Sequence, residues 1–151
     1  MIDTADTLPF HIEKTQESLS IFLCSSMENI DKASDETKKF LENKGLSCVI
    51  FDVCLVLREG LSNAVRHAHH SDPRKMIKYV LKVQEKDLVM EIEDQGEGFD
   101  WETAIRHMSH LEQGPLLEHG RGFKIMTEYV TEIKYNKKGN KLTLTKRVKK
   151  F

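Results

Sequence analysis

The sequence lacks the features of a membrane or exported protein. No apolar run is long enough to span a bilayer, and the first ten residues carry acids where a signal peptide needs bases. The chain also lacks the basic excess of a nucleic-acid-binding protein, because 23 lysine and arginine residues face 24 acidic ones and leave a net charge of -1. We therefore predict a cytoplasmic protein with neither a membrane nor a nucleic acid as partner.

Cysteine is scarce, and its pattern excludes two kinds of cross-link. The three cysteines are an odd number and form no CxxC pair: Cys24, Cys48 and Cys54. They predict buried thiols in a reducing cytoplasm, and neither a disulfide framework nor a zinc site. Internal repeats, linkers and low-complexity tracts are also missing from the 151 residues, so we expect a single domain over residues 1–151.

Hydrophobic periodicity predicts strands and helices in the order ββααββαββ. Apolar and polar residues alternate near residues 8–12, 19–23, 77–83, 88–94, 133–135 and 142–148. The helical period appears at residues 27–43, 47–70 and 120–129. Ser25 or Ser26 is predicted to cap the first helix, Gly45 to follow its end, and Ser47 to cap the second helix. The order predicts an α+β fold, a two-layer α/β sandwich with helices on one face of a mixed, mostly antiparallel sheet.

One stretch, REGLSNAVRHAHH at residues 58–70, places polar groups within an apolar helix. Glu59, Asn63 and His67 are spaced four apart, so they project from one stripe of that helix. The other stripes are apolar and can be buried: Leu57, Leu61, Ala64, Val65 and Ala68. Because polar groups without partners are costly in a buried helix, we infer that these three side chains serve a pocket.

Two glycine clusters follow at the ends of predicted elements. In the first, DQGEGF, Asp94 keeps the core-facing parity of its strand, and Gly96 and Gly98 let the backbone approach a ligand. A core-facing carboxylate needs a hydrogen-bond donor, and an exocyclic amine would supply one. The second cluster opens the last predicted helix, where backbone N–H groups and the helix dipole favour phosphate: Gly120, Arg121, Gly122 and Phe123.

The order of these motifs resembles the GHKL (Bergerat) ATP-binding fold: ExxxN on a helix, then DxGxG after a strand, then GxG opening a helix. Gyrase, the Hsp90 chaperone, histidine kinases and the MutL repair protein share that fold. More narrowly, the chain resembles the anti-sigma-factor serine/threonine kinases of bacterial partner-switching systems. Three features carry this narrower resemblance: the stretch GRGFKIMTEYV, the short segment 99–119 and the absence of an added phosphoacceptor-histidine domain.

The resemblance implies ATP and Mg²⁺ as ligands. Asn63 would coordinate the Mg²⁺ that bridges the phosphates, since an amide oxygen is a suitable ligand for a hard cation. Glu59, one helical turn earlier, would be the general base that takes a proton from a substrate hydroxyl. His67 would help to shape the phosphate side of the site.

The glycine clusters have implied roles as well. Asp94 would bind the adenine amine, and Gly96 and Gly98 would let the adenine pack closely with a lid at residues 99–119. The remaining nucleotide-binding residues would wrap the phosphates: Gly120, Arg121, Gly122 and Phe123.

The implied activity is that of an ATP-dependent protein serine/threonine kinase that is also a binding switch. By resemblance, it would phosphorylate a STAS-domain anti-anti-sigma protein, bind in turn that protein and a sigma factor or another effector, and form a homodimer. Glu118 and His119 depart from this branch, because many members carry there a basic residue that meets the γ-phosphate. Arg121 or Arg66 would have to substitute. The alternatives are a non-catalytic, nucleotide-gated interaction module and a histidine-kinase-like catalytic domain acting in trans.

Other polar clusters receive plainer interpretations. The histidines at 67, 69, 70, 107 and 110 are interpreted as surface residues rather than zinc ligands. The lysine-rich C-terminal hairpin predicts a solvated edge that discourages strand pairing. Trp101 lies in a possible short helix at residues 101–111, where a large aromatic side chain would contact the nucleotide or a partner.

Overall fold

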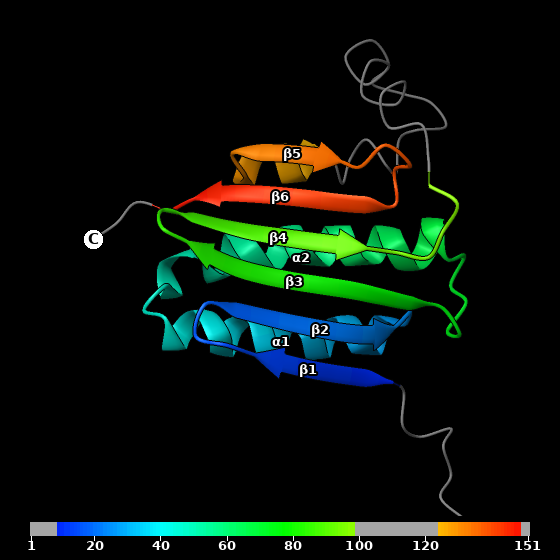
Figure 1. Ribbon diagram of the computed structural model, residues 1–151, viewed down its shortest axis with the longest axis horizontal. Coiled ribbons are helices and arrows are strands. Elements are labelled where there is room, and N and C mark those ends of the chain that lie inside the picture. The colour runs from blue at the N-terminus through cyan, green and yellow to red at the C-terminus, as the bar shows by residue number, and fades with distance from the viewer. Residues whose placement is uncertain (1–8, 99–123, 149–151) are drawn as a thin grey trace, which may run out of the picture.

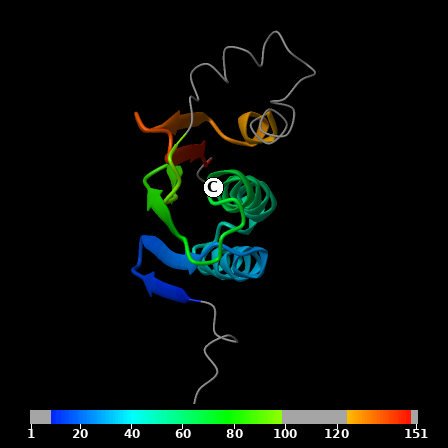
Figure 2. The same ribbon diagram turned by 90° about the vertical axis from the view of Figure 1, so that its right-hand side faces the viewer.

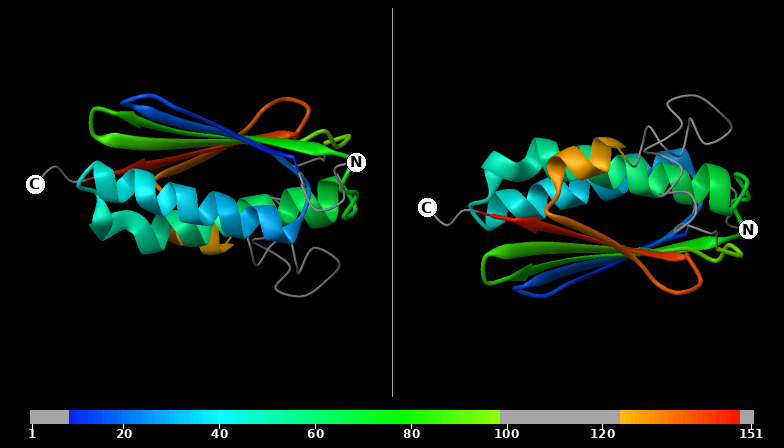
Figure 3. Two further views of the ribbon diagram at one scale, coloured as in Figure 1. Left: turned by 90° about the horizontal axis from the view of Figure 1, so that it is seen from below. Right: turned by 90° about the horizontal axis from the view of Figure 1, so that it is seen from above.

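The chain folds into two layers, shown in Figure 1 as a computed structural model that describes residues 9–98 and 124–148. One layer is a six-stranded sheet of order β1-β2-β3-β4-β6-β5, and the other is a set of helices on one face of that sheet (Figures 2 and 3). The strands are β1 Phe10–Lys14, β2 Ser18–Cys24, β3 Met76–Gln84, β4 Asp87–Glu93, β5 Glu132–Tyr135 and β6 Lys141–Arg147. The predicted α+β sandwich is confirmed.

The core forms between the helices and the inward-facing residues of the sheet. All five strand pairings are antiparallel, so the parallel contribution predicted for a mixed sheet is not found among the described strands. Alternate residues of each strand face the helices, as the period of two predicts. Most inward residues of the four central strands are at most 6% exposed, while Val83 and Lys146 are partly buried. The buried ones are Leu19, Ile21, Leu23, Ile77, Tyr79, Leu81, Leu88, Met90, Ile92, Leu142 and Leu144.

Helix α1 (Met27–Asn43) begins and ends where the sequence predicts. Ser26 Oγ accepts a hydrogen bond at 3.2 Å from the backbone N–H three residues on, which fixes the first turn. Gly45 follows the helix at φ +72°, and the Leu46 N–H donates to the Leu41 carbonyl at 2.9 Å. This closure leaves few helix carbonyls without a donor.

The central helix has three parts instead of the single helix predicted for residues 47–70. They are the 3₁₀ turn η2 (Ser47–Val49), the α-helix α2 (Ile50–Asn63) and the π-helix η3 (Ala64–Ala68). The prediction that Ser47 caps the helix is wrong, because Ser47 lies inside η2 and no side chain caps η2 or α2. The helix ends at Ala68, and His70 and Ser71 then take left-handed φ values of 49° and 59° that turn the chain away before Asp72. No helix of the described part is both long and apolar enough to cross a membrane.

The C-terminal part returns the chain to the sheet. Residues 124–129 are helical, and Met126 is fully buried there, as predicted. Asn136 begins the predicted hairpin turn between β5 and β6, where its Oδ1 accepts the N–H groups of Gly139 at 2.8 Å and Asn140 at 2.9 Å. Val148 lies just past the end of β6 and is 9% exposed.

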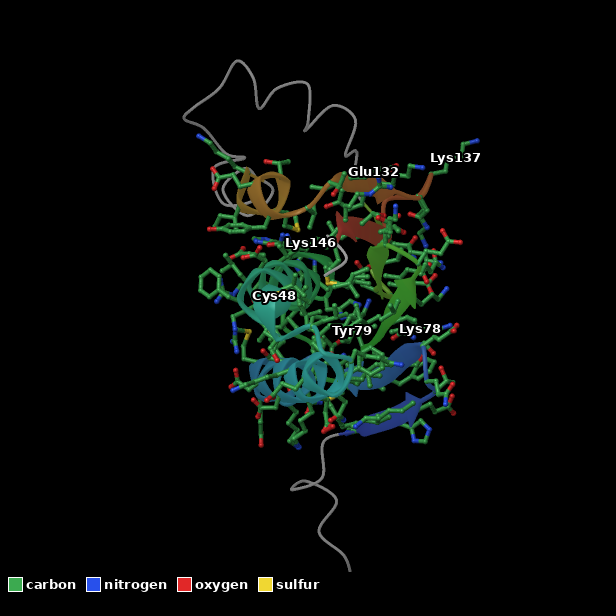
Figure 4. All side chains as sticks on the ribbon, turned by 90° about the vertical axis from the view of Figure 1, so that its left-hand side faces the viewer. Cys48, Lys78, Tyr79, Glu132, Lys137 and Lys146 are labelled. Carbon is green, nitrogen blue, oxygen red and sulfur yellow. The ribbon has the colours of Figure 1, made fainter. Side chains whose placement is uncertain are left out.

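The lysines of β6 do not form the solvated edge that the sequence predicts, because β6 lies between β4 and β5. Lys141 Nζ pairs with Glu91 at 3.1 Å, and Lys146 Nζ pairs with Asp52 of α2, also at 3.1 Å. The Lys146 side chain is only 15% exposed and donates a further hydrogen bond to the Tyr129 carbonyl at 2.8 Å (Figure 4). These contacts attach β6 to β4, to α2 and to the end of helical segment 124–129.

The prediction of three buried thiols holds for one cysteine in full. Cys24 is buried and Cys54 is partly buried, but Cys48 is exposed on the 3₁₀ turn η2 (Figure 4). The three thiols are free. The prediction is therefore wrong for Cys48, whose apolar neighbours in the sequence gave no sign that the turn projects outward.

Candidate functional site

A cavity of about 150 Å³ lies between the helix layer and the sheet, where α2 passes into η3. Its opposite wall comes from the end of β4, the loop that follows β4 and the β5–β6 hairpin. Four of the predicted site residues line this cavity: Asn63, His67, Asp94 and Gly98. The structure thus brings the ExxxN stretch beside the DxGxG stretch.

Asp94 follows the last residue of β4 and lines the cavity, as its inward parity predicts. Asn140 holds its backbone on both sides: the Asp94 N–H donates to the Asn140 carbonyl at 2.9 Å, and Asn140 Nδ2 donates to the Asp94 carbonyl at 3.2 Å. Burial raises the pKa of the Asp94 carboxyl, while the Gly96 N–H, donating to Oδ1 at 2.8 Å, acts to lower it. A partly desolvated carboxylate is a strong acceptor for an N–H group of a ligand.

Three glycines allow close approach of the segments around the cavity. A Cβ on Gly60 of α2 would come within 2.6 Å of a side-chain carbon of Ile92 on β4. One on Gly96 would come within 2.8 Å of a carbonyl oxygen of η3, and one on Gly98 would overlap the Lys138 carbonyl. The two glycines of the DxGxG motif therefore pack the loop against η3 and the β5–β6 hairpin, a role that the sequence did not indicate.

Two polar side chains that line the cavity, Tyr135 and Asn140, were not predicted. Tyr135 reaches it from β5, and burial, followed by the nearby Asp94 charge, raises the pKa of its phenol to about 12. The sequence offered one indication of this position: Tyr135 lies two residues after Ile133 and so shares its inward parity on the strand. Asn140 had no such signal, because its hydrogen bond to Asp94 spans 46 positions and no local pattern reports that contact.

The three histidines at the end of η3 lie in three different environments. His70 is exposed, as predicted, and His67 lines the cavity. The surface prediction is wrong for His69, which is 1% exposed and accepts a hydrogen bond at its Nε2 from the Gln95 N–H at 2.7 Å. Burial, and then the charge of Lys75, lower the pKa of the His69 imidazole.

Other predicted site residues are not brought to the described cavity. Glu59 is partly buried on α2, one turn before Asn63, but does not line the cavity as described. Several predicted features lie outside the described residues: the lid 99–119 with Trp101, Glu118 and His119, and the cluster Gly120, Arg121, Gly122 and Phe123. The structure therefore describes only part of the predicted site, the part formed by Asp94, Asn63 and His67.

The lining of the cavity suits a flat, amine-bearing ring. Its apolar walls come from Ala64, Ile92 and Leu142, while Asp94 offers an acceptor. Asn63 adds an amide oxygen, which is a ligand type for hard cations. Among the described lining residues none is lysine or arginine.

Comparisons with known proteins agree with this geometry. Residues 23–146 match the family described as "Histidine kinase-like ATPase domain". The chain is also similar to the anti-sigma F factor of Shouchella clausii (strain KSM-K16), with 24% identity over 83 residues, or 55% of this chain and 57% of that protein. The match thus spans little more than half the length of that relative. Because the family match runs from β2 to β6 and includes every described residue of the cavity, the chain belongs to the histidine kinase-like ATPase domain family, the GHKL group that its motifs indicate.

Proposed function

We propose that this protein binds ATP in the described cavity and is a protein serine/threonine kinase of the anti-sigma type. The observation that carries the proposal is the Asp94 carboxylate, which lines a cavity with Asn63 and His67. Burial raises the pKa of this carboxyl and so disfavours its charged form. The exocyclic amine of adenine would donate to it and offset that cost.

Magnesium fits the chemistry of the same site. Asn63 is the residue that would hold it, with phosphate oxygens and water as further ligands, since Mg²⁺ is usually bound through few protein groups. When bound, the ion would neutralise charge on the phosphates. His67 lies on the same wall of the cavity and would face the phosphate side.

Glu59 is the residue we assign to proton transfer. One turn before Asn63, it would accept the proton of a serine or threonine hydroxyl as the hydroxyl oxygen forms its bond to the γ-phosphorus. The bond between the γ-phosphorus and the bridging oxygen breaks, and ADP leaves with that oxygen. Glu59 has a partly buried position, which limits competition from solvent.

The proposed partners follow from the similarity to a protein named an anti-sigma factor. We propose a STAS-domain anti-anti-sigma protein as the phosphorylated substrate and a sigma factor or another effector as the alternative partner. A homodimer in the cytoplasm, with a lid at residues 99–119 over the nucleotide, completes the proposal. The cluster from Gly120 to Phe123 would wrap the phosphates.

One observation favours a second candidate, a non-catalytic module whose partner binding depends on the nucleotide. No lysine or arginine lines the described cavity, and Glu118 and His119 stand before the GxG cluster. In that case ATP and ADP would favour different conformations of the protein, and the partner would bind one of them. Arg121 is the residue whose contact with the γ-phosphate would separate the two candidates.

The test is a titration of a fluorescent ADP analogue into the purified protein, with and without Mg²⁺. Asp94→Asn is the matched variant, because its side chain keeps the shape and the acceptor for the Gly96 N–H but loses the charge. We expect Mg²⁺-dependent binding that Asp94→Asn weakens at least about tenfold, the size of one lost charged hydrogen bond. Binding that is unchanged in the variant would contradict the assignment of the cavity.

Phosphotransfer is tested separately with radiolabelled ATP and a STAS-domain protein from the same genome. Acid-stable phosphoserine or phosphothreonine supports the kinase, and its loss in Glu59→Gln with ADP binding intact supports the proton-transfer role. Acid-labile phosphate would identify histidine phosphorylation instead. Nucleotide binding without any transfer to the STAS protein would favour the non-catalytic module.

A further inference from the structure

His69 holds the loop that carries Asp94, although it does not line the cavity itself. Its ring is 1% exposed, and its Nε2 lies 2.7 Å from the backbone nitrogen of Gln95, the residue after Asp94. The Gln95 N–H can only donate, so Nε2 must be the unprotonated ring nitrogen. The imidazole is therefore neutral, with its proton on Nδ1.

The Nδ1–H group is buried and has no hydrogen-bond partner within the described residues. A buried donor without a partner has a cost of its own. Within the part of the chain that the structure describes, the ring is thus oriented by one hydrogen bond, the one to Gln95. Replacing the ring by an apolar residue would remove that bond and leave the Gln95 N–H without an acceptor.

The loop after β4 is held at its other points as well. The Gln95 side chain accepts the Met76 N–H at 2.8 Å, which joins the loop to the start of β3. Asn140 holds Asp94 from the hairpin. His69 supplies the third attachment, from the helix layer, and its imidazole is the one of the three holding groups that can gain a proton as the pH falls.

The backbone around His69 departs from the α-helix in a way that places its ring. The His69 N–H donates to the Ala64 carbonyl at 2.9 Å, the wider i to i−5 bond of the π-helix. His70 and Ser71 then adopt left-handed φ values, which are strained for residues other than glycine. A regular helix would place residue 69 at a different angle to the loop after β4.

We propose that His69 is a positioning residue for adenine recognition: its neutral ring holds the Gln95 amide and thereby keeps the Asp94 carboxylate directed at the cavity. This inference rests on the proposed nucleotide-binding function and adds a residue to the same site. Protonation of Nε2 would turn the acceptor into a donor, release the Gln95 N–H and loosen the loop.

Charged groups near the ring bear on this protonation. Lys75, in the loop between η3 and β3, disfavours the imidazolium, and Asp72 in the same loop favours it. Asp94 precedes Gln95, the hydrogen-bond partner of the ring. Burial outweighs these charges and lowers the pKa of His69, so the ring stays neutral at neutral pH. Adenine affinity is then expected to fall as the pH decreases below the range in which His69 is neutral.

The first experiment measures the tautomer in the nucleotide-free, full-length protein by long-range ¹H–¹⁵N NMR correlations of the histidine rings. We expect the Nδ1–H tautomer for His69 at neutral pH, with the Gln95 amide protected from hydrogen exchange until the ring is protonated. An Nε2–H tautomer, or a Gln95 amide whose exchange ignores the His69 titration, would overturn the proposal. This result does not depend on whether the protein binds a nucleotide.

The second experiment compares ADP and GDP binding in His69→Leu and His69→Gln. The leucine side chain lacks an acceptor, whereas the glutamine Oε1 can replace Nε2. We expect His69→Leu to weaken ADP binding about tenfold more than GDP binding, and His69→Gln to restore most of the difference. Equal weakening of both nucleotides would indicate general damage and would overturn the positioning role.

A double variant shows whether His69 acts through Asp94. In the Asp94→Asn background, His69→Leu should have little further effect on ADP affinity, because the group that it positions is already impaired. Fully additive losses would contradict the proposal. Failure of the wild-type protein to bind ADP would refute the proposed function, while the tautomer and the Gln95 exchange would still decide whether His69 holds the loop.

Discussion

Helices α1 and α2 lie side by side on the same face of the sheet, yet their ends are constructed differently (Figure 3). Helix α1 is capped by Ser26, closed after Gly45 and exposes a polar face. Helix α2 has no side-chain cap, begins from a 3₁₀ turn and passes into a π-helix that ends in two left-handed residues. Of these two helices, it is α2, the one that lines the cavity, that has irregular backbone at both ends.

This difference indicates that the two helices are under different constraints. The regular α1 anchors the sheet: its Thr37 Oγ1 lies 2.7 Å from the hydroxyl of the fully buried Tyr79, which extends between the layers (Figure 4). The irregular α2 and η3 place Asn63 and His67 in the cavity lining, and the residue after η3, His69, against the loop that follows β4. Strained and non-α backbone tends to occur where a site requires a particular direction for a side chain.

The largest contrast is expected between two glycines with similar positive φ. Gly98 (φ +84°) lies in the site, where a Cβ would overlap the Lys138 carbonyl, whereas Gly45 (φ +72°) has nothing within 4 Å of its Cβ position. We expect Gly98→Ala to cost about 3 kcal/mol, from strain plus overlap, and Gly45→Ala about 1 kcal/mol, from strain alone. Urea unfolding of both variants measures these values.

Nucleotide binding should also differ between the two glycine variants. Gly98→Ala should also weaken binding of the fluorescent ADP analogue, because the overlap moves the loop that carries Asp94. Gly45→Ala should bind as the wild type does. Similar destabilisation of the two variants, or intact binding in Gly98→Ala, would show that the loop does not need its contact with the hairpin.

A second contrast concerns two lysines near the C-terminus. Lys146 is mostly buried and joins Asp52 of α2 to the Tyr129 carbonyl, whereas Lys134 forms an exposed pair with Glu132 at 2.9 Å. We expect Lys146→Met to cost about 2 kcal/mol, since it leaves charged and carbonyl acceptors without their donor. Lys134→Met should cost less than about 1 kcal/mol, as exposed pairs do.

Salt dependence provides the control for these lysine variants. The effect of Lys134→Met should largely disappear at 1 M salt, where exposed charges are screened. Most of the effect of Lys146→Met should remain, because a partly buried pair and its hydrogen bond are screened less. Equal costs for the two variants at low salt would restore the interpretation of this hairpin as a solvated edge.

Much of the fold could be predicted because it depends on local periodicity. The alternation of β2, β3 and β4 and the caps of α1 are properties of short segments, and the structure agrees with them. The inward parity of Asp94 likewise predicted that it lines the cavity, and the spacing of four did so for Asn63 and His67 but not for Glu59. Apolar pattern alone did not separate the 3₁₀ turn at Ser47 from an N-cap, since serine occurs in both.

The rest of the site depends on contacts that no local pattern reports. A π-helix adds one residue to a turn without changing the apolar pattern, so η3 and the burial of His69 were not predicted. The contact of Asn140 with Asp94 joins a hairpin turn to a distant strand end. Lys146 is buried because β6 lies inside the sheet, between β4 and β5. The local sequence of β6 does not reveal this order of the strands.

A third prediction addresses the anchoring role of α1. Thr37 Oγ1 donates to the Ala33 carbonyl at 2.8 Å, so Tyr79 must donate its hydroxyl proton to Thr37. Thr37→Val would leave this buried hydroxyl without a partner and cost about 1.5 kcal/mol in thermal or urea unfolding. ADP affinity should not change, because neither residue lines the cavity.

The double variant Thr37→Val with Tyr79→Phe is the control for that prediction. Removing both partners removes the unsatisfied hydroxyl, so the double variant should be more stable than Thr37→Val alone. A double variant that is less stable than the single one would mean that the loss comes from packing rather than from the hydrogen bond.

The smallest contrast concerns the two serines that the sequence presents as helix caps. Ser26→Ala removes the side-chain acceptor at the start of α1 and should cost about 1 kcal/mol. Ser47→Ala removes an exposed hydroxyl that caps no helix and should change stability by less than about 0.5 kcal/mol. Urea unfolding of the two variants measures the difference in stability. An equal loss of stability in both variants would contradict the prediction. The start of α2 has no side-chain cap, so its position must come from packing and from the contact of Lys146 with Asp52. The double variant Ser47→Ala with Lys146→Met should therefore be as stable as Lys146→Met alone.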